Sequence, residues 1–215
     1  RTRFRAGLWR NVLVKEWRLI ARDPQLITQS LMQMLYLLPL VFVVFRRHDM
    51  LSLVVPGAVM LASTLAGSLA WITVAAEDAP ELIGAAPVPL ARVRRIKACA
   101  ALLPAWLLVL PLMGFLLLHE LLAALVFVVC LAGGTLSLVM TQLWYPRQAN
   151  RRDMRRRAQN AKLIGLLENL SAMGWAGAAF CLLHLPLYAP LALLVGSIGP
   201  LAAWFMGRSR RDESA

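Results

Sequence analysis

Acidic residues and histidine are scarce in this sequence of 215 residues, and each shortage argues against a class of function. Only 11 residues are Asp or Glu, against 23 Lys or Arg, and nearly all of the acids lie at the ends of apolar stretches. Ion-driven carriers usually place acidic groups near mid-membrane, and Glu168 is the one acid placed inside such a stretch. The 3 histidines are scattered, and no HExxH, GxSxG or paired-Asp motif occurs, so membrane enzymes of these kinds are not indicated.

An ATP-binding loop and a cysteine motif are missing as well. The phosphate-binding loop GxxxxGK[ST] needs a Gly-Lys pair, whereas the lysines here follow Val, Ile and Ala. Cys99, Cys130 and Cys181 lie in or beside apolar stretches without CxxC spacing, which favours packing over metal or redox roles. We therefore expect no enzyme activity, no cofactor and no metal site in this chain.

Apolar residues make up 60% of the sequence, which is too many for a soluble domain of this size. A membrane-spanning helix needs about 20 mostly apolar residues. Six stretches qualify, at about 24–45, 51–76, 98–118, 121–144, 163–185 and 187–206. The sequence predicts an all-α membrane protein with one six-helix unit over residues 24–206.

Basic residues are concentrated between these stretches and indicate the orientation. Apart from the neighbouring Arg46 and Arg47, every Lys and Arg falls in one of four patches: Arg1–Arg22, Arg92–Lys97, Arg147–Lys162 and Arg208–Arg211. Such residues concentrate on the cytoplasmic side of a membrane, so both termini, including a basic tail at 207–215, are predicted to be cytoplasmic. Nucleic-acid binding is the less favoured interpretation of the patches, because topology and anionic lipid headgroups already explain them.

Residues 1–23 precede the first predicted span and have the pattern of an interfacial helix. Apolar and basic residues alternate at helical spacing, and Trp9 and Trp17 suit the headgroup region. Asp23-Pro24 ends this helix and starts the next one.

Polar residues inside two predicted spans are candidates for a pathway or a helix interface. Gln25, Gln29 and Gln33 form one stripe of the first span, and amides in hydrocarbon need protein or water as partners. The stripe fits helix–helix contact better than a substrate path. Glu168 and Asn169 lie about two turns into the fifth span, where a functional role, snorkelling or pairing with an Arg are all open.

The loop at residues 77–97 after the second span is the most informative one. Asp78 and Glu81 flank Pro80 and form an acidic first turn, which favours the positive end of a helix. Gly84 and Pro87-Val88-Pro89 end that helix, and a basic helix begins at Leu90. A short helix held by prolines beneath the membrane is able to transmit a push from a partner to two spans.

Two further segments are expected to be irregular. Residues 142–157 form a strongly basic cytoplasmic loop. The last predicted span is interrupted by prolines and glycines, and its beginning is typical of a re-entrant segment that other protein must cover. These are Pro186, Pro190, Gly196, Gly199 and Pro200.

The sequence resembles the permease subunits of type-2 ATP-binding cassette (ABC) exporters. KEWRLIARDP at 15–24 resembles the opening of these permeases, and EDAPELIGAAPVPLARVRRIKA at 77–98 resembles their loop after the second span. The basic segment at 142–157 is similar to that of longer permeases, in which a unit like this one is the carboxy-terminal half. Residue 1 is not Met, so a fragment of a longer chain, a processed form and a trimmed form are all open.

The resemblance implies a bacterial inner-membrane, multi-pass exporter subunit with an elbow helix and a coupling helix. The coupling helix docks on a separate cytoplasmic ABC ATPase that carries ATP and Mg, and a second six-helix unit, from the same longer chain or a second copy, completes the pathway. Membrane lipids are the other expected partner. The coupling residues carried over are Glu77, Asp78, Pro80, Glu81, Arg92, Arg94, Arg95 and Lys97. The elbow residues are Lys15, Glu16, Arg18, Arg22 and Asp23.

We therefore expect a permease that exports an unidentified substrate with energy from a separate ATPase. The apolar interior and the glutamine stripe fit lipids, amphipathic drugs and peptides equally. One alternative is a non-transporting membrane scaffold or assembly protein that binds partners through its basic segments. The other is an ion-coupled carrier that uses Glu168.

Overall fold

The computed structural model describes residues 51–75, 90–144 and 154–212, together with eight single positions before residue 51. Apart from Glu120 and Leu185, every described residue is helical, which confirms the predicted all-α class for this part of the chain. The elements are α3 (Leu51–Ala75), α5 (Leu90–His119), α6 (Leu121–Trp144), α7 (Met154–His184), the short 3-10 helix η2 (Pro186–Tyr188) and α8 (Ala189–Asp212).

Five of these helices are long and apolar enough to cross a membrane, which indicates a multi-pass membrane protein. Their apolar windows are Leu53–Trp71, Arg95–His119, Leu121–Trp144, Leu163–His184 and Pro186–Met206. The first predicted span at 24–45, the elbow at 1–23 and the loop at 77–89 fall outside the described residues, apart from the single positions before residue 51. The count of six spans and the placement of the termini therefore stay predictions.

Two segments that were expected to be irregular are helical where the structure describes them. The basic segment is part of α7 from Met154 onward, because Arg, Ala, Gln and Lys are strong helix formers and no Gly or Pro interrupts them. The last span is one continuous helix from Ala189. Pro190 lies in its first turn, where a missing N–H is tolerated. Gly196 and Gly199 do not interrupt the helix and lie against α7. The predicted interruptions from Pro190 onward are therefore wrong for Ala189–Asp212, and the re-entrant beginning stays a prediction.

The turn between α5 and α6 is as short as the sequence indicated. Glu120 is the single non-helical residue between the two helices. Its N–H donates to the Leu116 carbonyl at 2.8 Å, and its own carbonyl accepts from the Ala124 N–H at 3.0 Å. These bonds satisfy backbone groups that a helix end normally leaves open. Helices α5 and α6 pack against each other, and the one-residue connection leaves no space for an inserted domain between them.

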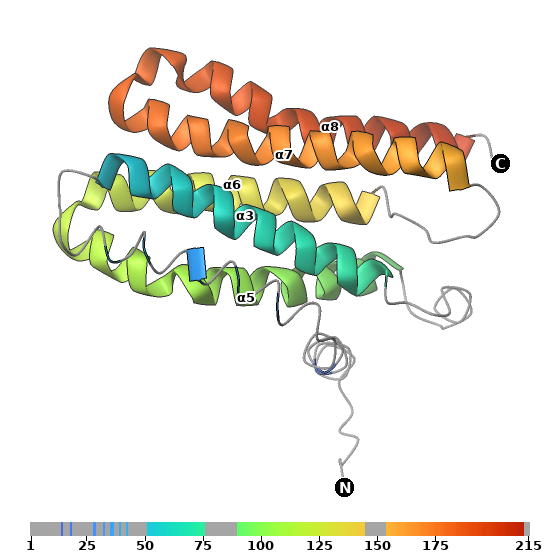
Figure 1. Ribbon diagram of the computed structural model, residues 1–215, viewed down its shortest axis with the longest axis horizontal. Coiled ribbons are helices and arrows are strands. Elements are labelled where there is room, and N and C mark those ends of the chain that lie inside the picture. Colours follow the sequence, from blue (N-terminus) through green and yellow to red (C-terminus); the bar gives the residue numbers. More distant parts are fainter. Residues whose placement is uncertain are drawn as a thin grey trace, which may run out of the picture.

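Consecutive helices run antiparallel, with α3 and α6 between α5 on one side and α7 and α8 on the other (Figure 1). Helix α3 packs against α5, α6 and α7, and α6 packs against each of the other four. Phe127 and Leu131 of α6 are fully buried against Val55 and Val59 of α3 and Leu116 of α5. The most enclosed parts of the bundle are accordingly α3 and α6, while α5 and α8 present most of their surface outward.

The connection from α3 to α5 and the connection from α6 to α7 lie at the same end of the bundle (Figure 1). The last residue of α3, the first of α5, the last of α6, the first of α7 and the last of α8 all lie at this end (Figure 1). The basic residues at the starts of α5 and α7 and at the end of α8 are therefore on one side of the bundle, as the orientation predicted from the charges requires. We call it the basic end.

Candidate functional site

The structure describes seven of the predicted site residues: Arg18, Arg92, Arg94, Arg95, Lys97, Glu168 and Asn169. The other elbow residues (Lys15, Glu16, Arg22, Asp23), the acidic part of the coupling segment (Glu77, Asp78, Pro80, Glu81) and the glutamine stripe (Gln25, Gln29, Gln33) lie outside the described residues. Arg18 is helical and exposed. The roles of all of these residues stay predictions.

The basic run that follows the coupling segment lies in the first turns of α5, and its members differ in burial. Arg95 is exposed, whereas Lys97 is only 4% exposed. Two residues apart on a helix, the side chains point in nearly opposite directions. Of these two residues, Arg95 is therefore the one that is accessible to a partner, whereas Lys97 lies inside the bundle.

Glu168 lies at the interface of α6 and α7, where the Gln142 Nε2 atom donates a hydrogen bond to its Oε1 atom. Gln142 is 2% exposed and is one of the largest fully buried side chains in the described part of the bundle. Its Oε1 atom has no hydrogen-bond partner there. Gln142 had been assigned to the basic loop; the signal for its burial is that it still belongs to the apolar stretch at 121–144.

Asn169, the neighbour of Glu168, is exposed and lies outside this interface. The next polar side chain that points inward is Ser171, whose hydroxyl donates to the Gly196 carbonyl of α8. Hydroxyls in a bundle interior commonly bond across helices in this way. Together with Gln142 and Glu168, this bond makes a polar seam that joins α6, α7 and α8 toward the basic end.

Farther from the basic end, the seam continues at Trp175, whose indole Nε1 donates to Ser137 Oγ of α6 at 2.9 Å. The indole fits only because its neighbours are glycines. A Cβ atom on Gly133 would overlap the ring, and one on Gly196 would lie 2.9 Å from Trp175 Cδ1. Small residues let the backbones of neighbouring helices come close together, and a large aromatic ring then buries much of its surface between them. Gly133 and Gly196 thus form a slot for the Trp175 ring between α6 and α8.

Two buried polar atoms in or beside the seam have no hydrogen-bond partner. Besides Gln142 Oε1, the buried Ser63 Oγ of α3 makes no hydrogen bond. A Cβ on Gly134 would collide with that hydroxyl, so Ser63 is packed tightly against α6. Within the described residues, no group of three or more His, Cys, Asp or Glu side chains is arranged to hold a metal ion. The geometry is that of a hydrogen-bonded helix interface.

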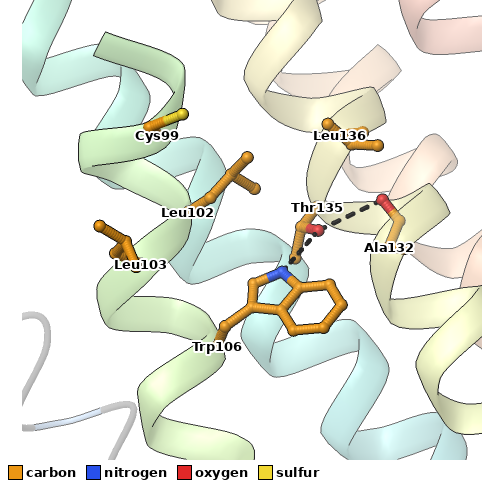
Figure 2. A pocket seen from close by; sticks show the side chains of 7 residues that line it. All are labelled: Cys99, Leu102, Leu103, Trp106, Ala132, Thr135 and Leu136. Atoms are coloured by element: carbon orange, nitrogen blue, oxygen red, sulfur yellow. Dashed lines mark hydrogen bonds between the residues drawn. The ribbon is translucent and has the colours of Figure 1, made fainter. Parts of the chain in front are cut away.

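A groove between α5 and α6 is a second candidate, with a volume of about 580 Å³. Figure 2 shows its lining residues, with Cys99 and Trp106 toward opposite ends. Trp106 Nε1 donates to Thr135 Oγ1 at 3.3 Å, and that hydroxyl donates to the Leu131 carbonyl at 2.7 Å. The lining consists of Cys99, Leu102, Leu103, Trp106, Ala132, Thr135 and Leu136. Pockets of 300–1,000 Å³ with mostly apolar walls are typical sites for small apolar ligands.

Comparison with known proteins adds no relative to these observations. No protein-family model, curated protein or solved structure matches the chain. The function is therefore argued from the residues and the bundle.

Proposed function

We propose that this chain is the membrane permease component of an ABC-type transporter in a bacterial inner membrane. In this proposal it exports a substrate with energy from ATP hydrolysis by a separate cytoplasmic subunit, and a second six-helix unit completes the pathway. The observation that carries the proposal is the connection of the proline-bounded acidic segment to α3. This segment follows the end of a helix that packs against α5, α6 and α7.

The packing explains how a push on that segment would act. Residues 76–89 join Ala75, the last residue of α3, directly to Leu90, the first residue of α5. Coupling between distant sites travels through rigid elements that are packed together. A displacement of the segment would thus reach α5 through the chain and α6 and α7 through α3, so that four helices respond to one contact.

The location of charge supports an external energy source. The sequence has no phosphate-binding loop of the GxxxxGK[ST] kind. Glu168, the acid placed within an apolar stretch, bonds to a buried amide at a helix interface. A carboxylate held in this way suits a structural contact, whereas carriers driven by ions need an acid that alternates between two sides.

The decisive experiment reverses the charges of the acidic segment. The full-length chain is purified from its native membranes, and the bound Mg-ATPase activity is measured for the wild type and for a Glu77→Lys, Asp78→Lys, Glu81→Lys variant. We expect the wild type to retain an ATPase and the variant to lose it. In the variant, positively charged lysines replace the acidic residues that are proposed to dock on the ATPase.

Two control variants make the result specific. Asp153→Lys reverses an acid in another connection at the basic end, and Glu120→Lys reverses one at the opposite end. Both should keep the ATPase. If no ATPase is bound to the wild type, or if the triple variant keeps it, the coupling proposal is wrong. A bound ATPase without ATP-dependent transport in reconstituted vesicles would instead favour the scaffold.

A further inference from the structure

We propose that the groove between α5 and α6 binds one acyl chain of an anionic phospholipid whose phosphate is held by Arg95. The site requires only that the apolar helices lie in a membrane, and it is independent of the coupling to an ATPase. Nothing in the proposed transport function assigns a role to this groove, which lies on the face of the bundle formed by α5 and α6.

The cation and the groove lie on the same face of α5. Arg95, Cys99, Leu102 and Trp106 follow one another at spacings of four, three and four residues, which places them in one row along a helix. The last three line the groove, so the row begins with Arg95 at the groove's end nearest the basic end of the bundle. Arg95 is exposed and makes no ion pair or hydrogen bond with the described residues.

The dimensions of this row match half of a bilayer. Trp106 is the eleventh residue after Arg95. At ~1.5 Å per residue the two are roughly 16 Å apart along the helix, close to half of the ~30 Å hydrocarbon core. Helical side chains lean toward the N-terminal end, which is the basic end for α5. The guanidinium thus extends to the headgroup level while Trp106 ends the groove near the middle of the membrane.

The groove's lining selects hydrocarbon. Its polar side-chain groups, the Thr135 hydroxyl and the Trp106 N–H, bond to each other, so an occupant gains no hydrogen bond from them. Leu103 and Leu136 are exposed, and the groove therefore opens to the surface of the bundle. A flexible chain is able to enter such an opening and gains van der Waals contacts with the groove's lining.

A packed helix is a poorer occupant than a lipid chain. Helices that pack in membranes approach over small residues, whereas the exposed residues of this groove's lining are the large side chains Leu103 and Leu136. The groove also ends at a cation, which favours an anion at the headgroup level. A lipid with a negative headgroup satisfies both features at once.

The test uses the reactivity of Cys99, because its thiol lines the groove. The full-length protein is reconstituted in nanodiscs of phosphatidylcholine, with or without phosphatidylglycerol, and treated with N-ethylmaleimide. Peptide mass spectrometry then gives the alkylation rates of Cys99 and of Cys181 on α7, a partly buried internal reference. We expect phosphatidylglycerol to slow alkylation of Cys99 about fivefold, the effect of one interfacial Arg on anionic-lipid binding, and to leave Cys181 unchanged.

Two pairs of variants complete the experiment. Arg95→Gln should remove the effect of phosphatidylglycerol on Cys99. The control Arg208→Gln, near the end of α8, should keep it. Ala132→Leu fills the groove and should abolish retention of phosphatidylglycerol in native mass spectrometry, whereas Ala202→Leu on α8, also partly buried, should keep it. Equal Cys99 rates in both nanodiscs overturn the proposal: equal fast rates mean an open groove, and equal slow rates mean a protein segment or a second copy. A lipid effect that survives Arg95→Gln overturns it as well.

Discussion

Replacing Gly174 with Ala is the sharpest test of how α7 and α8 pack. A Cβ atom at this position would lie 2.6 Å from the Gly196 Cα atom and 2.8 Å from the Val195 carbonyl carbon. Ordinary van der Waals contacts of a Cβ are 3.4–4 Å. The obstacle is the backbone of α8, so no side-chain rotation relieves it, and the two helices must move apart.

The expected magnitude follows from two opposing effects. Overpacking by one methyl group costs about 1–3 kcal/mol, and separating α7 from α8 also weakens the Ser171 hydrogen bond to the Gly196 carbonyl. Ala is a better helix former than Gly by about 1 kcal/mol, which offsets part of this loss. We expect a net destabilisation of about 1–2 kcal/mol, and hence a melting temperature lower by about 2–8 °C for a chain of this length.

The measurement is thermal unfolding of the purified protein in one detergent, followed by circular dichroism. Gly177→Ala is the matched control, because a Cβ there meets only Ala192 Cβ at 3.9 Å, on the same pair of helices. It should be neutral or stabilising by up to about 1 kcal/mol, as expected for helix propensity alone. If Gly174→Ala melts at or above the temperature of Gly177→Ala, the close approach of α7 and α8 is refuted.

Substitutions at three further positions test the polar seam and the neighbouring Ser63 with the same assay. Ser63→Ala should leave the melting temperature unchanged or raise it, because the buried hydroxyl has no partner to lose; a clear decrease would contradict this. Trp175→Phe should destabilise by about 0.5–1.5 kcal/mol through loss of the bond to Ser137 and of ring contact, and wild-type stability would show that the bond contributes nothing. Glu168→Leu should destabilise more than Glu168→Gln, since only Gln keeps an acceptor for the Gln142 amide. Transport that is lost, together with its pH dependence, in Glu168→Gln at wild-type stability would instead favour the ion-coupled carrier.

Hydropathy was sufficient to predict the described helices, because a helix that crosses a membrane must satisfy its backbone within one apolar segment. It was insufficient to predict which helices are central. The windows of α5 and α6 have nearly the same mean hydropathy, 2.3 and 2.5, yet α5 is largely exposed and α6 is mostly enclosed. Lipid and protein interior are equally apolar, so a leucine carries no information about which of the two it faces.

Glycine caused the largest error of the sequence-based prediction. Gly196 and Gly199 were interpreted as interruptions of the last span, although in the structure they are the positions where α8 meets α7. A Cβ on Gly199 would lie 3.0 Å from Ser171 Cβ. A glycine that breaks a helix and a glycine that admits a neighbour have the same local sequence, and only the partner helix distinguishes them.

The distribution of small residues determines which parts of the bundle can respond together. Helices α7 and α8 approach most closely at Gly174 and Gly199, where an added Cβ would meet the backbone of the partner helix. The interface of α3 with α6 is close as well, because a Cβ on Gly134 would collide with Ser63 Oγ and one on Gly67 would lie 3.1 Å from Leu138 Cβ. Packed elements move as rigid bodies and slide where side chains are able to rearrange. In the proposed coupling, a push delivered at the end of α3 would therefore be passed on to α6 as well as to α5, and the Gln142–Glu168 bond would report any motion between α6 and α7.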